Sequence, residues 1–354
     1  MDIESLSKLQ EVVGKDVVDF EILLGWMDEH SIGSGPIENV RLLAGGTQNI
    51  LVRFDRENKT YVLRRPPVHL RKASNEVLRR EATILKSLGK TSVPHPKFIL
   101  GCDDETVMGV VFYLMEYIEG FNPATGLPEC YLKNESFRFE MGLDAVKGAA
   151  VLGSQDYISL ELQDYGKPEG FLERQVNRWL SELESYSVIE GYEGPQIAGL
   201  EEVSRWLEEF RPITFEPGIM HGDYHLANLY FDLNTPKLSA ILDWEMSTIG
   251  DPLVDLGWLI ATWPGDDALA VGPAMGLKDV TGFPTKSEMI EHYSKFSTRD
   301  LVQIDWYVVF ACFKLGIILE GTHARACGGK ADKGVGDLLH SITVALFDKA
   351  LKLC

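Results

Sequence analysis

One polar stretch near the middle of the chain constrains its fold more than any other feature. Residues 220–228 read MHGDYHLAN, and residues 243–245, fifteen positions after Asn228, read DWE. Short apolar runs precede and follow the first segment and lead into the second. This pattern predicts three short buried strands whose ends and connecting loops carry polar groups.

The polar residues of these two segments have the spacing that phosphoryl transfer from ATP requires. Asp223 can orient an acceptor hydroxyl and take its proton, while the amide oxygen of Asn228 and the carboxylate of Asp243 are hard ligands for Mg²⁺. A turn in which His, Gly and Asp only cap backbone groups is the alternative for each residue alone. The presence of the whole set favours catalysis.

A third segment, GDPLVDL at residues 250–256, completes a recognisable series with HGDxHxxN and LDWE. Together they resemble the aminoglycoside and choline phosphotransferase family, and most of all its branch fused to acyl-CoA dehydrogenases. The resemblance runs from about residue 35 to about residue 325. It implies an α+β, bilobal, protein-kinase-like fold: a small, mainly antiparallel β N-lobe (1–118) that binds nucleotide, and a larger, mostly helical C-lobe (119–354) with the catalytic and metal loops and the acceptor site.

The N-lobe expected from this resemblance supplies the nucleotide contacts. A glycine-rich turn between two strands, Gly45-Gly46-Thr47-Gln48, would bring backbone N–H groups close to phosphates. Arg64 ends the third strand, where a kinase normally has Lys, and Arg65 is the competing phosphate ligand. Glu81, on a helix expected over 74–88, matches the family's partner for that cation. The backbone groups of Glu116 and Ile118 correspond to the hinge that holds the base.

Periodic apolar residues predict the remaining elements. We expect a helix within 1–34, strands at 40–44, 50–54, 61–64 and 109–117, and helices near 137–150, 171–183, 200–210, 301–319 and 341–351. The 301–319 segment is apolar nearly all round, which is typical of a buried helix.

Composition limits the partners and the compartment. The net charge of −19 argues against nucleic acid or an anionic membrane surface and is compatible with a cationic substrate. Five cysteines without a CxxC motif favour a reducing, cytoplasmic setting. The polar start of the chain predicts no signal peptide, and no apolar run reaches the roughly 18 residues of a membrane span. A monomer or homodimer is expected.

The resulting hypothesis is a kinase that uses ATP, or GTP in its place, with Mg²⁺ to phosphorylate a hydroxyl of a small molecule. His221 and Asp255 would support the catalytic loop, and His225, Glu245 and Glu320 are candidate acceptor contacts. The acceptor stays open between an aminoglycoside-like cation and a hydroxyacyl compound. An inactive nucleotide-binding scaffold is one alternative. A protein kinase is the other, and it is disfavoured because Asp251 follows Asp243 by only eight positions, which leaves no room for an activation segment.

Overall fold

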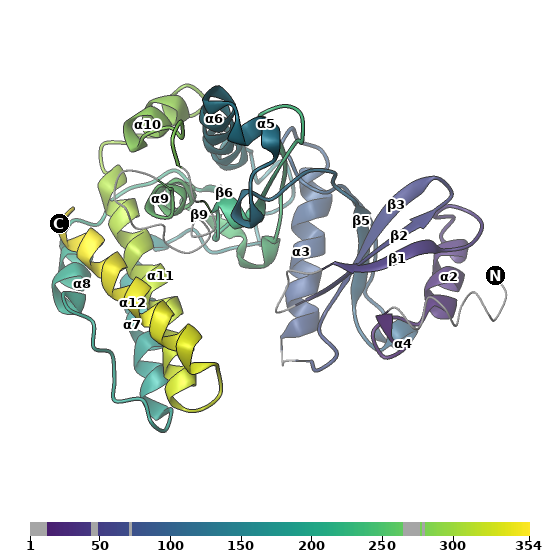
Figure 1. Cartoon of the computed structure of the whole chain (residues 1–354), viewed down its shortest axis with the longest axis horizontal. Helices are drawn as coiled ribbons and strands as arrows, with labels where there is room; N and C mark the ends of the chain where they lie inside the picture. Colours follow the sequence, from purple (N-terminus) through teal and green to yellow (C-terminus); the bar gives the residue numbers. More distant parts are fainter. Residues whose placement is uncertain (1–12, 44–48, 71–72, 265–276, 278–279) are drawn as a thin grey trace. The chain divides into compact units, whose positions relative to one another are not determined.

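The computed structural model describes residues 13–43, 49–70, 73–264, 277 and 280–354. The chain divides into two compact units. The first comprises Met1–Glu119 and the short segment Leu242–Glu245, and the second comprises Gly120–Ile241 and Met246–Cys354. Figure 1 labels most of the elements of both units.

The first unit is built on a five-stranded antiparallel sheet with the strand order β1-β2-β3-β5-β4. Its elements are α2 (Phe20–Glu29), β1 (Glu38–Leu43), β2 (Ile50–Arg56), β3 (Lys59–Arg65), α3 (Ser74–Leu88), β4 (Phe98–Cys102), α4 (Glu105–Met108) and β5 (Phe112–Glu116). Register is continuous along the β2–β3 hairpin, so the side chains of β3 alternate regularly between the two faces of the sheet.

Helices α2 and α3 lie against opposite faces of this sheet. Leu63 of β3 belongs to a buried cluster with Phe20, Leu23 and Met27 of α2. The next residue along the strand, Arg64, instead bonds a side chain of α3. Because neighbouring residues of a strand face opposite sides, the core packs under α2 and the charged contacts lie under α3.

The second unit is mostly helical and carries two small antiparallel sheets, β6–β9 and β7–β8. Its elements are α5 (Glu129–Leu132), α6 (Glu135–Gly153), α7 (Gln175–Ser185), α8 (Leu200–Glu209), β6 (Gly218–Met220), β7 (Leu229–Phe231), β8 (Leu238–Ile241), β9 (Thr248–Gly250), α9 (Leu253–Ala261), α10 (Lys286–Ser294), α11 (Ile304–Cys327) and α12 (Lys333–Leu351). The three strands predicted around the polar stretch are β6, β7 and β8.

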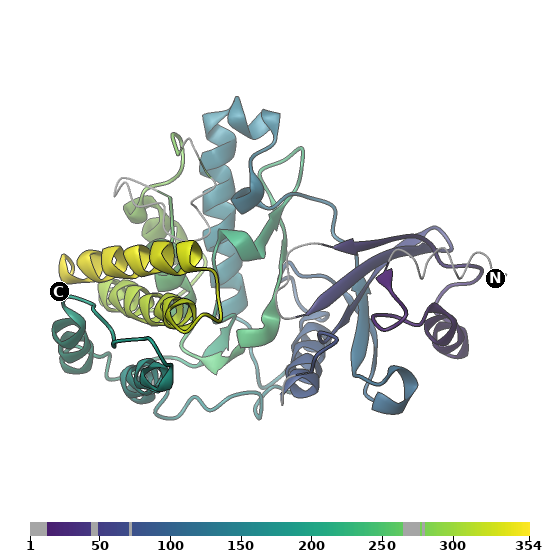
Figure 2. The ribbon, with the colours of Figure 1, turned by 60° about the horizontal axis from the view of Figure 1, so that its bottom comes forward.

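Helix α11 is the centre of this unit, and α12 and α9 pack along it (Figures 1 and 2). Most of its residues are buried, as the all-round apolar pattern predicted. Gly257 of α9 allows the close approach, since a Cβ there would lie 2.6 Å from the backbone of Tyr307. In the described part of the chain no helix has the length and apolarity that crossing a bilayer would take.

Some boundaries differ from the sequence prediction. In the described part of the region expected to be helical, the helical Val13 is followed by non-helical residues. Helix α2 then begins at Phe20, where the Asp19 side chain accepts hydrogen bonds from two N–H groups of the first turn. Helix α3 spans Ser74–Leu88, as predicted. The strand expected from residue 109 begins at Phe112, because the preceding residues form α4, which ends at the left-handed Gly109.

The α9–α11 contact generates a prediction about stability. Gly257→Ala should lower the free energy of unfolding by about 1–3 kcal/mol, because the added methyl group overlaps the backbone of Tyr307. Gly25→Ala, at an exposed position of α2 with nothing near the new methyl group, is the matched control. It should be neutral or stabilising by up to about 1 kcal/mol. Urea denaturation measures both, and equal stability of the two variants would contradict the tight contact.

Candidate active site

The polar stretch forms a loop between β6 and β7 that a buried carboxylate holds in place. Asp255, in the first turn of α9, accepts hydrogen bonds from the backbone N–H groups of His221 (2.5 Å) and Gly222 (2.8 Å). These are the backbone contacts that we expected for Asp255. Gly222 has φ +84°, and a Cβ there would lie 2.4 Å from the carbonyl oxygen of Met246. The loop therefore needs glycine at this position.

Asp223 is fixed by its own loop. The Asn228 side-chain nitrogen donates to the backbone oxygen of Asp223 (2.9 Å) and to its carboxylate (3.0 Å), and His225 Nε2 lies 3.1 Å from the other carboxylate oxygen. Burial opposes ionisation, but the His225 contact and the nearby Lys314 charge hold the pKa of Asp223 well below its usual range. Asp223 is thus a carboxylate at neutral pH, and both of these contacts of Asn228 use its side-chain nitrogen.

Lys314 of α11 is the main functional candidate that sequence reasoning missed. Its Nζ donates to the backbone oxygen of Gly222 (2.7 Å) and lies 4.3 Å from the centre of the Trp258 ring, and its side chain is buried. Burial lowers the pKa of Lys314 to about 8, although Asp223 and Asp255 favour its charged form. The available signal was a lone charge within the apolar run 306–319, because an unpaired lysine is rarely buried.

In the first unit, Arg64 joins two carboxylates. It donates to both oxygens of Glu81 (2.8 and 2.5 Å) and to Asp243 (2.9 Å). Burial disfavours the charged guanidinium, yet Glu81 and Asp243 raise the pKa of Arg64 above its ordinary value. Arg65 points to the other side of β3 and donates to the backbone oxygens of Pro66, Asp16 and Val17. Pairing with Glu81 therefore belongs to Arg64, and Arg65 anchors the N-terminal segment.

Beside Arg64 lies a set of potential oxygen ligands for a metal ion. Glu81, Asp243 and Glu245 each present a carboxylate oxygen, and these atoms lie within 4.8 Å of one another. Burial and the neighbouring Asp243 and Glu245 raise the pKa of Glu81 to about 7 against the opposing charge of Arg64, and a hard divalent cation would favour the ionised form of all three carboxylates. Asp243 also has φ +63°, a left-handed conformation that Asp tolerates at a small cost. The residues present thus fit Mg²⁺.

The structure describes only some of the predicted nucleotide contacts. Gly45, Gly46, Thr47 and Gln48 lie outside the described residues. Glu116 ends β5 and donates its backbone N–H to Lys97 (2.9 Å), and Ile118 follows in the connecting segment, so their hinge role stays a prediction.

The candidate acceptor residues differ in their surroundings. His225 has a buried Nδ1 that lacks a hydrogen-bond partner among the residues described. Glu245 is half-buried, beside the carboxylates just named. Glu320 is fully buried, and its oxygens contact Tyr192 and His340 at 2.8 Å each.

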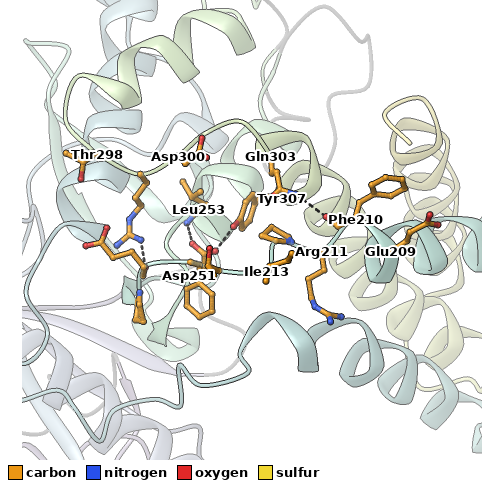
Figure 3. A pocket seen from close by; sticks show the side chains of 16 residues that line it. Glu209, Phe210, Arg211, Ile213, Asp251, Leu253, Thr298, Asp300, Gln303 and Tyr307 are labelled. Carbon is orange, nitrogen blue, oxygen red and sulfur yellow. Dashed lines mark hydrogen bonds between the residues drawn. The ribbon is translucent and has the colours of Figure 1, made fainter.

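A pocket of about 840 Å³ lies elsewhere in the second unit (Figure 3). Its wall includes Asp251, whose carboxylate accepts hydrogen bonds from the Tyr307 hydroxyl (2.6 Å) and from the backbone of Leu253 (3.1 Å). Among the described residues that line it there is no predicted catalytic, metal or nucleotide ligand. Asp251 therefore has a structural role, and we assign no substrate to this pocket.

The sequence profile of the phosphotransferase enzyme family matches residues 39–279, which include the loop of Asp223, the strand of Arg64 and the segment of Asp243. This chain belongs to the phosphotransferase enzyme family. The predicted resemblance is thereby confirmed, and the phosphotransferase match extends over more than half of the chain.

The chain is also similar to three known proteins. Human acyl-CoA dehydrogenase family member 11 is 28% identical over 98% of the chain, which corresponds to 44% of the human protein. A Ralstonia eutropha structure described as a candidate aminoglycoside phosphotransferase is 27% identical with a TM-score of 0.77 and covers 94% of this chain and 98% of that one. Choline kinase from Cryptosporidium parvum is 14% identical with a TM-score of 0.62 and covers 95% of each. The chain spans less than half the length of the curated relatives that it matches. The bilobal, kinase-like α+β class is confirmed by these structures.

The contrast between Arg64 and Arg65 generates a kinetic prediction. Arg64→Ala should raise the KM for ATP and lower kcat together, because a phosphate contact helps both the bound substrate and the transition state. Arg64→Lys should recover part of the loss, since it restores charge but not the two-pronged geometry. Glu81→Ala should show a milder defect, and the double variant should be less than additive. Steady-state kinetics with varied ATP measure these effects.

Arg65→Ala is the matched control for that series. It removes bonds to three backbone oxygens, so it should lower the melting temperature and leave the KM for ATP unchanged. A large rise in KM at Arg65 with none at Arg64 would reverse the assignment.

The position of Lys314 generates a pH prediction. Activity should fall as pH rises through about 8, where Lys314 loses its proton and the loop loses the positive charge beside Asp223. Lys314→Met should lower kcat about 10- to 100-fold and remove this alkaline limb, since the Gly222 carbonyl loses its donor. Lys349→Met, at a lysine of α12 that donates to the backbone oxygen of Ala261 at the end of α9, should keep the limb. An unchanged limb in Lys314→Met would contradict the role.

The free energy of unfolding should also depend on the protonation of Lys314. The pKa of Lys314 is lower in the folded chain than its ordinary value of about 10.5, so the unfolded chain binds more protons between pH 8 and 10.5. The contribution of Lys314 to the free energy of unfolding must therefore rise with pH in that window. The difference in stability between wild type and Lys314→Met isolates this contribution.

Proposed function

We propose that this chain transfers the γ-phosphoryl group of ATP to a hydroxyl of a small molecule. The observation that carries the proposal is the state of Asp223. It is an ionised, half-buried carboxylate, and each of its oxygens has a side-chain contact. Asp255 and Lys314, which lie outside the loop of Asp223, hold that loop through its backbone. A fixed carboxylate of this kind can accept a hydrogen bond from an acceptor hydroxyl and fix its direction of attack.

In the proposed reaction the acceptor oxygen attacks the γ-phosphorus, and the bond between that phosphorus and the β–γ bridging oxygen breaks to give ADP. The hydroxyl proton passes to Asp223 as the new bond forms. The low pKa of Asp223 makes it a weak base, so orientation of the hydroxyl is its larger contribution in a loose transition state. His225 and Asn228 keep the carboxylate from turning away.

Arg64 would bind phosphate oxygens, and Glu81 would keep its guanidinium extended and in one orientation. Asn228 and Asp243 would hold Mg²⁺, with Glu245 as a further oxygen donor nearby. Mg²⁺, when bound, neutralises charge on the phosphates and on the leaving ADP. The backbone of Glu116 and Ile118 would hold the base, and the Gly45–Gln48 turn would cover the phosphates.

The acceptor is proposed to be a hydroxyacyl compound rather than an aminoglycoside. The relatives that match nearly the whole chain are longer proteins named for the acyl-CoA dehydrogenase family. A phosphotransferase part carried within such a protein is expected to act on a compound that the protein also handles as an acyl group. The net charge of −19 is the argument for a cationic acceptor instead.

A screen of acceptors separates these possibilities. ADP release should be stimulated by hydroxyacyl thioesters or hydroxy acids and not by aminoglycosides or choline. Stimulation by a cationic acceptor alone would reject the hydroxyacyl proposal while keeping the kinase. Loss of ATP turnover with every acceptor, despite nucleotide binding, would favour the inactive scaffold, and phosphate transfer to generic protein substrates would favour a protein kinase.

Asp223 and Asp243 should differ in which step they affect. Asp223→Asn should bind nucleotide with unchanged affinity and lose about 10²- to 10⁴-fold in kcat, because it removes the acceptor of the hydroxyl proton. Asp243→Asn keeps a side chain that tolerates the left-handed backbone and should weaken Mg²⁺-dependent nucleotide binding as well as kcat. Calorimetry with and without Mg²⁺ and steady-state kinetics measure both.

Asp164→Asn, at an exposed loop position, is the matched control for the loss of one carboxylate. It should leave binding and kcat unchanged. Near wild-type turnover in Asp223→Asn would reject the assignment of the base, and an unchanged Mg²⁺ requirement in Asp243→Asn would reject the metal role.

A further inference from the structure

Three potential metal ligands meet between α11 and α12, at positions that the proposed reaction does not use. Glu320 and His323 are three residues apart on α11, which places them on one face of that helix, and His340 comes from the middle of α12. One ligand atom from each lies within 4.8 Å of the other two. The two imidazole rings stack with centres 4.6 Å apart.

Glu320 has no arginine or lysine within ion-pair distance in the described part of the chain. Its side chain is fully buried, and its oxygens contact the Tyr192 hydroxyl and His340 Nδ1, each at 2.8 Å. Tyr192 is neutral, since burial raises the pKa of its hydroxyl. A buried carboxylate in such surroundings is costly without a cation.

His323 supplies an independent observation. Its Nδ1 is buried and has no hydrogen-bond partner within the described part of the chain. The nearest acidic group, Asp337, lies 3.8 Å away, beyond hydrogen-bond distance. A buried imidazole nitrogen without a partner is unfavourable, and coordination of a cation would use its lone pair.

We propose that Glu320, His323 and His340 bind a divalent transition-metal ion of the zinc class. Two imidazoles and one carboxylate are a common zinc ligand set, and they leave a fourth position for water. The rings are stacked, so at least one of them has to turn for both lone pairs to face one ion. The ion would neutralise Glu320 and link α11 to α12. Glu320 then acts inside the helix pair rather than as the acceptor contact expected from sequence.

The test is metal binding by the full chain, measured without nucleotide or acceptor. After treatment with a chelator, the protein should bind about one Zn²⁺ in competition with a chromophoric chelator, and Zn²⁺ should raise its melting temperature. His323→Ala should weaken Zn²⁺ binding at least about 10-fold. The variant loses no hydrogen bond at Nδ1 but removes the contacts of the ring with His340 and Cys327, so the melting temperature of the metal-free variant is measured beside its Zn²⁺ affinity.

Two further variants complete the set. Glu320→Gln keeps an oxygen for Tyr192 but loses the charge, and His340→Ala removes the ligand from α12, so both should weaken Zn²⁺ binding similarly. Cys327→Ser, Cys130→Ser and Cys354→Ser remove exposed thiols that bind zinc adventitiously and should leave the affinity unchanged. Cys327 is the informative control because its Sγ lies 3.6 Å from His323 Nε2.

Absence of Zn²⁺ binding, or binding that is the same in His323→Ala, Glu320→Gln and His340→Ala as in wild type, overturns the site. Binding that is lost only with the cysteines overturns it as well. Because no readout involves phosphoryl transfer, the result is independent of the proposed function.

Discussion

The hydrogen bonds from the backbone of His221 and Gly222 to Asp255 are the interaction on which the candidate active site depends. Burial raises the pKa of Asp255 above its ordinary value, and His221, the two N–H groups and the charge of Lys314 offset only part of that rise. Both carboxylate oxygens are used, so the loop has a single well-defined position. Asp223 and Asn228 belong to the same loop, so the contacts that fix the loop also fix these two residues.

Much of this arrangement could be predicted because the residues involved are close in sequence or follow a simple period. The strand of Arg64 and Arg65 alternates sides, so one contact of Arg64 with Glu81 was enough to settle which arginine lies beside α3. Asp255 was expected to support the loop of Asp223, from which it accepts two backbone hydrogen bonds. For residues without a distinctive local pattern, the predicted roles came from the family resemblance.

Other features could not be predicted because they rest on contacts between distant segments. Lys314 lies 92 positions after the carbonyl group that it binds, in a helix whose pattern predicts only burial. The first residues of the expected strand at 109–117 form a turn because Asp104 caps a short helix there. Local hydrogen bonds of this kind compete with an apolar pattern, and the pattern alone does not show which of them prevails.

The aromatic surroundings of Lys314 have a spectroscopic consequence. Its ammonium group lies 4.3 Å from the centre of the Trp258 ring and 5.4 Å from that of Trp179. A charge so close to an indole face perturbs the energy of the excited ring, so the emission of these tryptophans senses the proton on Lys314. The chain therefore carries an intrinsic optical probe one hydrogen bond away from the loop of Asp223, and no label has to be attached to follow that loop.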